Sequence, residues 1–321
     1  MPELHENFLQ VVREHTAGDP QRAEIRWTNL SKKDLVTKMA KTTTPVGRRV
    51  VAQLLAHHRY RKRKLRKCLA MGHVRGRNEQ FENIARLREE FWDSPNPMLS
   101  MDTKKKEYLG TYYREGRLYT LEAQLVFDHD FAHAADGVIY PHSLYDLKRN
   151  VGHLYLGLSH DTSAFACDNI LRWWKTHGRV WYPRATSILL LCDCGGSNDY
   201  RRYVFKEQLH WLAERLQLEV RVAHYPPYTS KYNPIEHRLF PHVTRACQGV
   251  VFDRLSTVVQ LMRNTRTSTG LRVTVRVVDK FYATGQACTA EFKRAMPIVF
   301  DEDMPRWNYR AVPTLLRAND P

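Results

Sequence analysis

The stretch "SILLLCDCGGSN", residues 187–198, decides the fold. Its unbroken apolar run, residues 188–191, predicts a strand buried on both faces, as in a parallel sheet covered by helices on both sides. The run leads to a lone carboxylate, Asp193, and two glycines follow shortly after it. The strand would hold Asp193 rigidly, and the glycines would let another backbone approach closely.

The segments around this strand predict a definite order of strands and helices. Apolar periodicity predicts three strands, then helix, strand, helix, strand and helix. A glycine, Gly178, is expected to end the first of these helices, and Pro234 suits the first turn of the last one. This is the order of a ribonuclease H-like fold, an α/β mixed sheet flanked by helices. The predicted strands are 98–103 with 107–113, 137–147, 152–159, 187–193 and 219–226, and the predicted helices are 163–178, 200–217 and 233–249.

A small helical region is predicted ahead of the sheet. Ser31 and Asp34 form a capping box at the start of one helix, and "TTTPVG" separates it from a second helix, whose first turn Pro45 suits. Two short helices, a tight turn and a basic arm are typical of a helix-turn-helix DNA-binding region. Arg48 and Arg49 would open the second helix. The alternative is an ordinary helical hairpin with a solvated, charged tail.

The domain boundaries follow from these elements. The basic arm is "RYRKRKLRK", residues 59–67, and a further helix is predicted over 79–93 before "SPNP" breaks the chain. We therefore expect a DNA-binding region at 1–78, a connecting helix and linker at 79–97, and a catalytic domain with a C-terminal extension at 98–321.

Composition narrows the class of partner. The formal net charge is +16 and the sequence pI is about 9.7, which favours a polyanion, here double-stranded DNA. No run of eighteen apolar residues and no signal peptide are evident, so we expect no membrane partner and a cytoplasmic, nucleoid-associated protein. The six cysteines show no CxxC spacing, so neither a zinc knuckle nor a disulfide framework is indicated.

Three acids occupy comparable places in the predicted fold. Asp102 lies at the end of the first strand, Asp193 at the end of the fourth, and Glu236 in the first turn of the helix after the fifth. The first and fourth strands are neighbours in this fold, so the carboxylates would meet. Clustered acids repel one another unless a cation is bound, and hard oxygen ligands suit Mg²⁺ or Mn²⁺. Two such ions, roughly 3.5–4 Å apart, can activate the attacking oxygen and stabilise the leaving one in phosphodiester cleavage.

Each acid also has a structural interpretation. An Asp at the end of a strand is commonly a turn residue or a helix cap. Asp161 is one such case, because it precedes a predicted helix and is better read as an N-cap than as a ligand. Only the joint placement of the other three acids at matching positions of one fold favours catalysis.

Basic and polar residues flank the acids. Lysines there would hold phosphates near the metal ions, and Asn198 would either cap a helix or contact DNA. The alternative for each is a solvated loop. With the N-terminal arm included, the predicted DNA contacts are Arg48, Arg49, Arg59, Arg61, Lys62, Arg63, Lys64, Lys104, Lys105, Lys106, Asn198, Lys231 and Arg238.

Several of these segments resemble a known family. "SMDTKKKEYLG", "CDCGGSNDYRR", "YPPYTSKYNPIEHRLF" and "TSTGLRV" look like signatures of bacterial insertion-sequence transposases with a DDE catalytic domain, of the Rhodopirellula type. The long stretch "LYDLKRNVGHLYLGLSHDTSAFACDNILRWW", the opening "RWTNLSKKDL" and the late "WNY" are similar as well. The resemblance runs from about residue 20 to 313.

The resemblance implies a fold, an activity and a site. The acidic triad would be Asp102, Asp193 and Glu236 in a ribonuclease H-like domain with Mg²⁺ or Mn²⁺, two ions in all. The enzyme would cleave at the terminal inverted repeats of a transposon and join the freed 3′ end to target DNA, as at least a dimer. Cys194 departs from the small residue usual after the second Asp, and the segment before "RWTNLS" is short for the family. The latter suggests a shortened copy, which bears on recognition of the transposon end.

Two other functions fit the same residues. A nuclease with this fold would cut without joining. A catalytically inactive DNA-binding remnant of a truncated element would bind without cutting.

Overall fold

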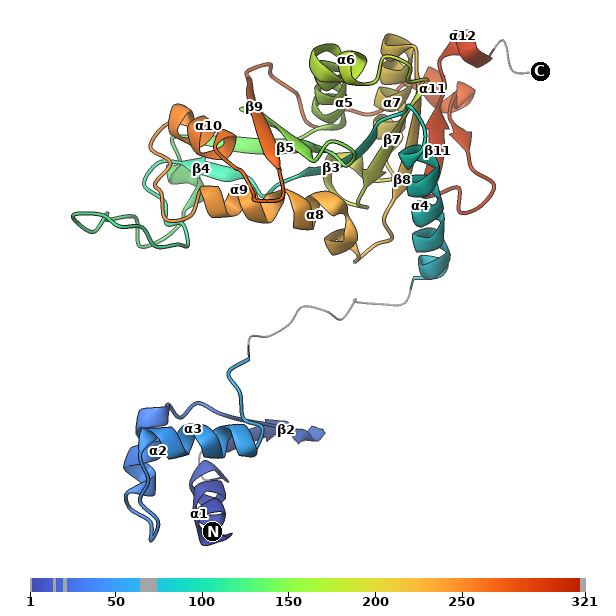
Figure 1. Cartoon of the computed structure of the whole chain (residues 1–321). Helices are drawn as coiled ribbons and strands as arrows, with labels where there is room; N and C mark the ends of the chain where they lie inside the picture. The colour runs from blue at the N-terminus through green and yellow to red at the C-terminus, as the bar shows by residue number, and fades with distance from the viewer. Residues whose placement is uncertain (1, 14–15, 20–21, 64–73, 318–321) are drawn as a thin grey trace. The chain divides into compact units, whose positions relative to one another are not determined.

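The computed structural model describes residues 2–13, 16–19, 22–63 and 74–317. The chain forms two compact units, residues 1–69 and 70–321 (Figure 1). Lys64, one of the predicted DNA contacts, lies outside the described residues. In the described part of the chain no helix is long and apolar enough to cross a membrane.

The first unit packs three helices around a small apolar core. Its elements are α1 (Pro2–Arg13), β1 (Thr16–Asp19), β2 (Arg22–Thr28), α2 (Lys32–Met39) and α3 (Arg48–His57). Side chains from all three helices are buried together, including Phe8, Leu35 and Val51. The capping box of α2 is confirmed, because Ser31 and Asp34 each accept a hydrogen bond from the other's backbone N–H.

The region differs from the prediction in three ways. Helix α1 and the antiparallel β1–β2 hairpin are additional to the predicted elements. The connection between α2 and α3 spans residues 40–47, which is longer than a tight turn. Pro45 is not in the first turn of α3, because Gly47 is the N-cap and the helix begins at Arg48.

The second unit is built on one large mixed sheet. Its strand order is β10-β11-β8-β7-β3-β5-β6-β9, with β4 paired to β5. Strands β3, β7 and β8 are parallel neighbours, while β5 runs antiparallel to both β3 and β6. This confirms the ribonuclease H-like fold. The strands are β3 (Met98–Thr103), β4 (Glu107–Leu109), β5 (Gly137–Asp146), β6 (Val151–Gly157), β7 (Ser187–Cys192), β8 (Glu219–His224), β9 (Arg272–Val278), β10 (Val299–Phe300) and β11 (Asn308–Ala311).

Helices cover both faces of the sheet (Figure 1). Strand β7 is buried throughout, and its apolar side chains alternate between two cores: Leu190 packs with α5 and α7, and Leu191 packs with α4, α8, α9 and α10. The helices are α4 (Arg77–Trp92), α5 (Ser163–Trp173), α6 (Arg179–Trp181), α7 (Tyr203–Leu216), α8 (Pro234–Arg238), α9 (Phe240–Ala246), α10 (Leu255–Arg263), α11 (Ala290–Ala295) and α12 (Thr314–Arg317).

Two helical segments differ from the prediction. Gly178 does not end its helix, since a π-helical turn, Trp174–Gly178, carries the chain into α6. A Cβ at Gly178 would collide with the rings of Trp173 and Trp174, so the glycine provides space. Helix α4, expected as a connection, contributes Ile84, Leu87 and Phe91 to the core of the second unit.

Candidate active site

The pairing of β3 with β7 brings the first two acids to the same edge of the sheet. The parallel register aligns Ser100 with Leu191 and Met101 with Cys192. Asp102 and Asp193 are each the next residue along, where the carboxyl ends of the two strands lie side by side. The sequence places both acids at strand ends, and the observed register explains why they meet.

Helix α8 is fixed to β3 by a buried hydrogen-bond network. The hydroxyl of Ser100 donates to Asn233 Oδ1 at 2.5 Å and accepts from the backbone N–H of Ile235 at 3.0 Å. Asn233 Nδ2 donates to the Met101 carbonyl at 3.2 Å. Because Asn233 is the N-cap of α8, these bonds hold the first turn of the helix, and with it Glu236, against the end of β3.

Ser100 and Asn233 are positioning residues that the sequence interpretation missed. Both are fully buried, as is Ile235. The signal was available in "NPIE", where an Asn and a Pro precede the acid, since Pro at the first helical position and Asn at the cap define the start of a helix.

The three carboxyl groups act on one another electrostatically. Burial is the largest effect on Asp102, and together with the charges of Asp193 and Glu236 it raises the pKa of Asp102 well above its ordinary value. Burial also raises the pKa of Glu236, to which the charge of Asp193 adds, while a hydrogen bond with Asp102 and the charge of Lys104 oppose the shift. Burial raises the pKa of Asp193 as well. The cluster therefore disfavours full ionisation unless positive charge enters it.

Asp193 is held from two directions. Its Oδ1 accepts from the Gly195 N–H at 3.1 Å and from Asn198 Nδ2 at 3.4 Å. Behind it, His224 Nδ1 bonds the Asp193 carbonyl at 2.7 Å and His224 Nε2 bonds the Tyr309 hydroxyl at 2.8 Å. Burial lowers the pKa of His224 to about 4, so its imidazole is neutral near pH 7.

Two residues of this neighbourhood lie differently from their predicted places. Asn198 neither caps a helix nor faces solvent, because it is 4% exposed and its amide faces Asp193. Asp161 is not the N-cap of α5, because that cap is Thr162. Asp161 instead hydrogen-bonds the side chains of Thr103 and Ser197, and burial together with the charge of Asp193 raises its pKa. Its Oδ1 is buried without a hydrogen-bond partner.

The lysines that follow Asp102 differ in availability. Lys104 pairs with Glu107 at 2.5 Å and is 13% exposed, so its charge is partly neutralised. Lys105 and Lys106 are exposed, and Lys106 lies over the ring of Tyr108. Lys231 and Arg238, which flank Glu236 in sequence, are exposed as well.

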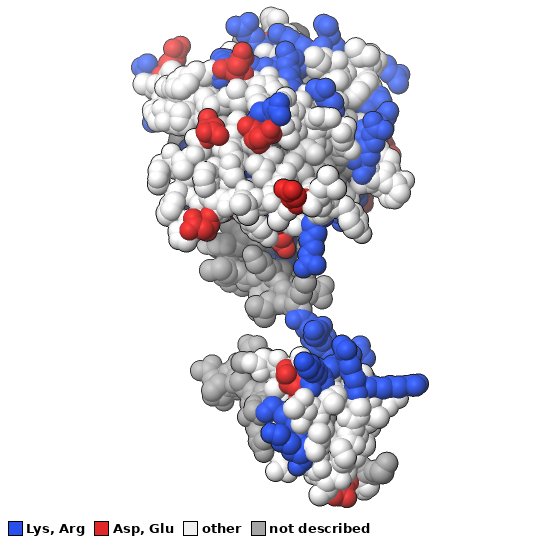
Figure 2. Space-filling view, turned by 90° about the vertical axis from the view of Figure 1, so that its left-hand side faces the viewer, with Lys and Arg blue, Asp and Glu red and all other residues white. Residues whose placement is uncertain are grey.

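Exposed basic residues gather on the described part of the first unit (Figure 2). Arg48 and Arg49 lie in the first turn of α3, and their exposure agrees with a role in contacting a partner. The arm after α3 is exposed at Arg59, Arg61, Lys62 and Arg63.

The donor set fits a hard divalent cation. Asp102, Asp193 and Glu236 offer only carboxylate oxygens, the ligand type that Mg²⁺ and Mn²⁺ prefer. The raised pKa values show that three negative charges here are costly, and a bound cation would reverse that cost. The arrangement is therefore a candidate site for a divalent cation.

Comparison with known proteins identifies the family. A family model described as the Rhodopirellula transposase DDE domain matches residues 7–313. No curated protein matches the sequence. The chain belongs to this family and is a transposase with a DDE domain, in the broad class of enzymes that cleave or transfer nucleic acid, whose members generally use divalent metal ions.

Solved structures of Mos1 transposase are similar at a lower level. A paired-end complex with the left transposon end is 12% identical, with 80% of this chain and 68% of that chain covered and a TM-score of 0.43. A pre-cleavage transpososome is 11% identical, with 80% and 69% covered and a TM-score of 0.45. A mariner paired-end complex with Mn is 12% identical, with 80% and 69% covered and a TM-score of 0.43.

Proposed function

We propose that this transposase cleaves phosphodiester bonds at the terminal inverted repeats of its element and transfers the freed 3′ end into target DNA. The observation that supports the proposal is that Asp102, Asp193 and Glu236 lie at two adjacent strand ends and one helix start, and that the other two acids act electrostatically on Asp102. Family membership supplies the reaction class, and the shared site supplies the residues.

Asp102, Asp193 and Glu236 are the proposed ligands for two Mg²⁺ or Mn²⁺ ions. When bound, such ions neutralise the carboxylates and assist both the attacking and the leaving oxygen of the displacement. Asp102 and Asp193 would hold the ions from the adjacent ends of β3 and β7, and Glu236 would complete the site from α8.

The surrounding residues position these groups. Ser100 and Asn233 fix the start of α8, and Asn198 and Gly195 orient the carboxylate of Asp193. Rigid placement matters because a misplacement of about 1 Å costs roughly 100-fold in rate. Basic residues around the site would contact DNA phosphates: Lys104, whose charge Glu107 partly neutralises, and Lys105, Lys106, Lys231 and Arg238.

The first unit is proposed to hold the terminal repeat. Arg48, Arg49 and the arm from Arg59 would meet double-stranded DNA, and each phosphate contact adds to the salt dependence of binding. Asn198 is left out of the proposed DNA contacts because its amide is buried against Asp193. The active complex would contain at least two copies of the chain, as the family implies, because two transposon ends must be held together while each is joined to target DNA.

A strand-transfer assay tests the proposal. The purified chain is incubated with labelled DNA that carries the element's own end, a target plasmid and Mg²⁺ or Mn²⁺. We expect nicking at the end and joining to the plasmid, and the loss of both in Asp102→Asn, Asp193→Asn and Glu236→Gln. Nicking without joining would replace the proposal by a nuclease function. Binding without cutting in either metal would identify a DNA-binding remnant.

A further inference from the structure

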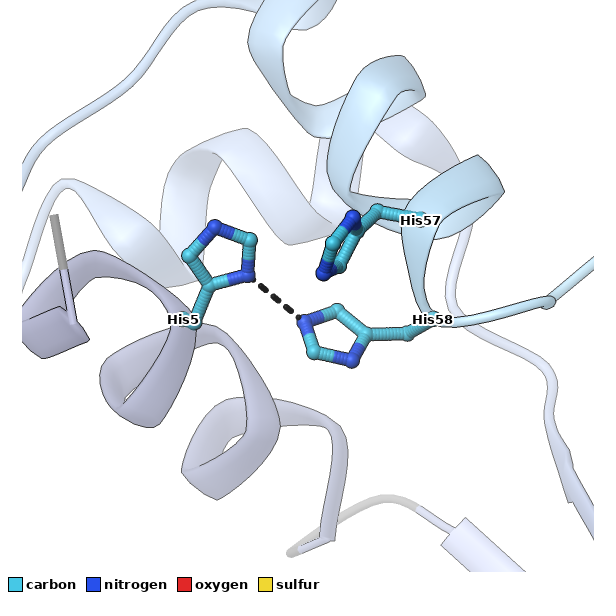
Figure 3. A group of neighbouring side chains, drawn as sticks. All are labelled: His5, His57 and His58. Atoms are coloured by element: carbon cyan, nitrogen blue, oxygen red, sulfur yellow. Dashed lines mark hydrogen bonds between the residues drawn. The ribbon is translucent and has the colours of Figure 1, made fainter.

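Three histidines meet in the first unit, outside the acidic site. His5 lies in α1, His57 is the last residue of α3, and His58 is the C-cap of α3 (Figure 3). Their ring centroids are 4.7 to 5.1 Å apart. One ligand nitrogen from each ring lies within 4.8 Å of the others. The imidazole of His5 thus lies beside those of His57 and His58, which are more than fifty positions away in the sequence.

We propose that His5, His57 and His58 bind a divalent transition-metal ion of the zinc type, which joins α1 to the end of α3. Imidazole nitrogens bind Zn²⁺ at about 2.0–2.1 Å, so two of them in a tetrahedral site lie about 3.3 Å apart. His5 Nδ1 and His58 Nε2 are already 3.0 Å apart. Three protein ligands leave the fourth position for water.

The geometry favours the third ligand as well. His57 is exposed, so solvent leaves room for its ring to turn. Figure 3 shows that ring lying beside the other two. A simple packing arrangement accounts for His5 and His58, which share a hydrogen bond while Phe8 stacks on His58 at 5.5 Å. It does not account for His57, for which the described contacts include ring contacts with both histidines but no hydrogen bond.

The end of α3 is a favourable place for a cation. His57 and His58 stand at the C-terminal end of α3, where the helix dipole presents partial negative charge.

The position of the site gives the metal a structural role. Directly after His58, Arg59 adopts a left-handed conformation with φ of 63°, and the N–H of Tyr60 donates to the Leu55 carbonyl at 2.8 Å. These two features end α3 and change the direction of the backbone where the basic arm begins. An ion held by both helices would therefore fix the direction in which the arm leaves α3 and stabilise the packing of α1.

Zinc titration of the full-length chain without a histidine tag tests the site. Excess Mg²⁺ is included to compete with Zn²⁺ for the acidic residues. By calorimetry and metal analysis, we expect His57→Gln and His5→Gln each to bind one equivalent of Zn²⁺ fewer than the unchanged chain. The control variant is His133→Gln, which changes an exposed histidine of the second unit. It should bind the same number of Zn²⁺ equivalents as the unchanged chain.

Two further readouts complete the test. Zn²⁺ at 100 times its dissociation constant should raise the melting temperature of the first unit by roughly 10–20 °C, and this rise should be lost in His57→Gln. Imidazole NMR signals of the three histidines should shift on binding. Equal Zn²⁺ stoichiometry in the unchanged chain and both variants, or unshifted imidazole signals, would overturn the proposal. Circular dichroism establishes that the variants are folded.

Discussion

Replacing Asn233 with alanine tests whether this residue positions Glu236 for catalysis in addition to stabilising the fold. The change removes the acceptor for Ser100 and the donor to the Met101 carbonyl, in a fully buried network. Removing two hydrogen bonds and leaving their polar partners unpaired costs about 2–4 kcal/mol. In a unit of this size, that lowers the melting temperature by roughly 5–15 °C.

A matched variant isolates the effect on catalysis. Asn308 is also fully buried, and its amide exchanges two hydrogen bonds with Gln80 at 2.9 and 2.7 Å. Asn308→Ala should therefore lose a similar amount of stability while α8 keeps its hold on β3. The assay is single-turnover cleavage of a transposon end, at a temperature at which calorimetry shows both variants to be folded.

The two variants should differ in cleavage rate. Asn233→Ala releases the start of α8, so Glu236 moves and we expect the rate to fall about 100-fold. Asn308→Ala should cleave within a few-fold of the unchanged enzyme. If Asn233→Ala cleaves at the same rate as Asn308→Ala, the network of Ser100 and Asn233 does not position Glu236.

Three further outcomes are expected. Because the pKa of Asp102 is raised in the folded chain, its stabilising contribution is complete below its ordinary value of 3.8 and is lost as pH rises through the folded value. Calorimetry in EDTA should thus show the second unit melting at lower temperature as pH rises, with a smaller fall in Asp102→Asn and in saturating Mn²⁺. Gly152→Ala should lower the free energy of unfolding by about 1–3 kcal/mol in chemical denaturation, since its Cβ would collide with Leu239 between α8 and α9. Arg48→Ala with Arg49→Ala should weaken binding of terminal-repeat DNA. Fluorescence anisotropy should show the slope of log K against log salt reduced by about 0.9 for each phosphate that the two arginines neutralise.

The fold was predictable because the pattern of β7 and the order of the following elements are strongly constrained. An apolar run with both faces buried cannot be placed at an exposed edge, so residues 187–191 define the centre of the sheet. The chain order of strands and helices then leaves few topologies. The hairpin of the first unit was missed because residues 16–28 show no clear apolar alternation.

The sequence predicts the acidic residues of the candidate site, but it does not predict the residues that position them. Asp102, Asp193 and Glu236 sit at element ends, which periodicity locates. The pattern "NPIE" identifies Asn233 as a helix cap, but its pairing with Ser100 depends on a register between distant segments, which no local pattern reveals. The prediction for Asp161 was wrong for the same reason, since a cap and a buried carboxyl beside Asp193 look alike in sequence.

Placing a softer ligand at position 102 tests whether Asp102 binds metal at the site that cuts DNA. Asp102→Cys replaces a hard oxygen by a thiolate, which binds Mg²⁺ poorly and accepts softer divalent ions. Cleavage of transposon-end DNA by this variant should be lost in Mg²⁺ and recovered in Mn²⁺ or Cd²⁺, whereas Asp102→Asn stays inactive in all three. If Asp102→Cys were as active in Mg²⁺ as the unchanged enzyme, or if Asp102→Asn were active in any of these ions, Asp102 would not be a metal ligand of the cutting site.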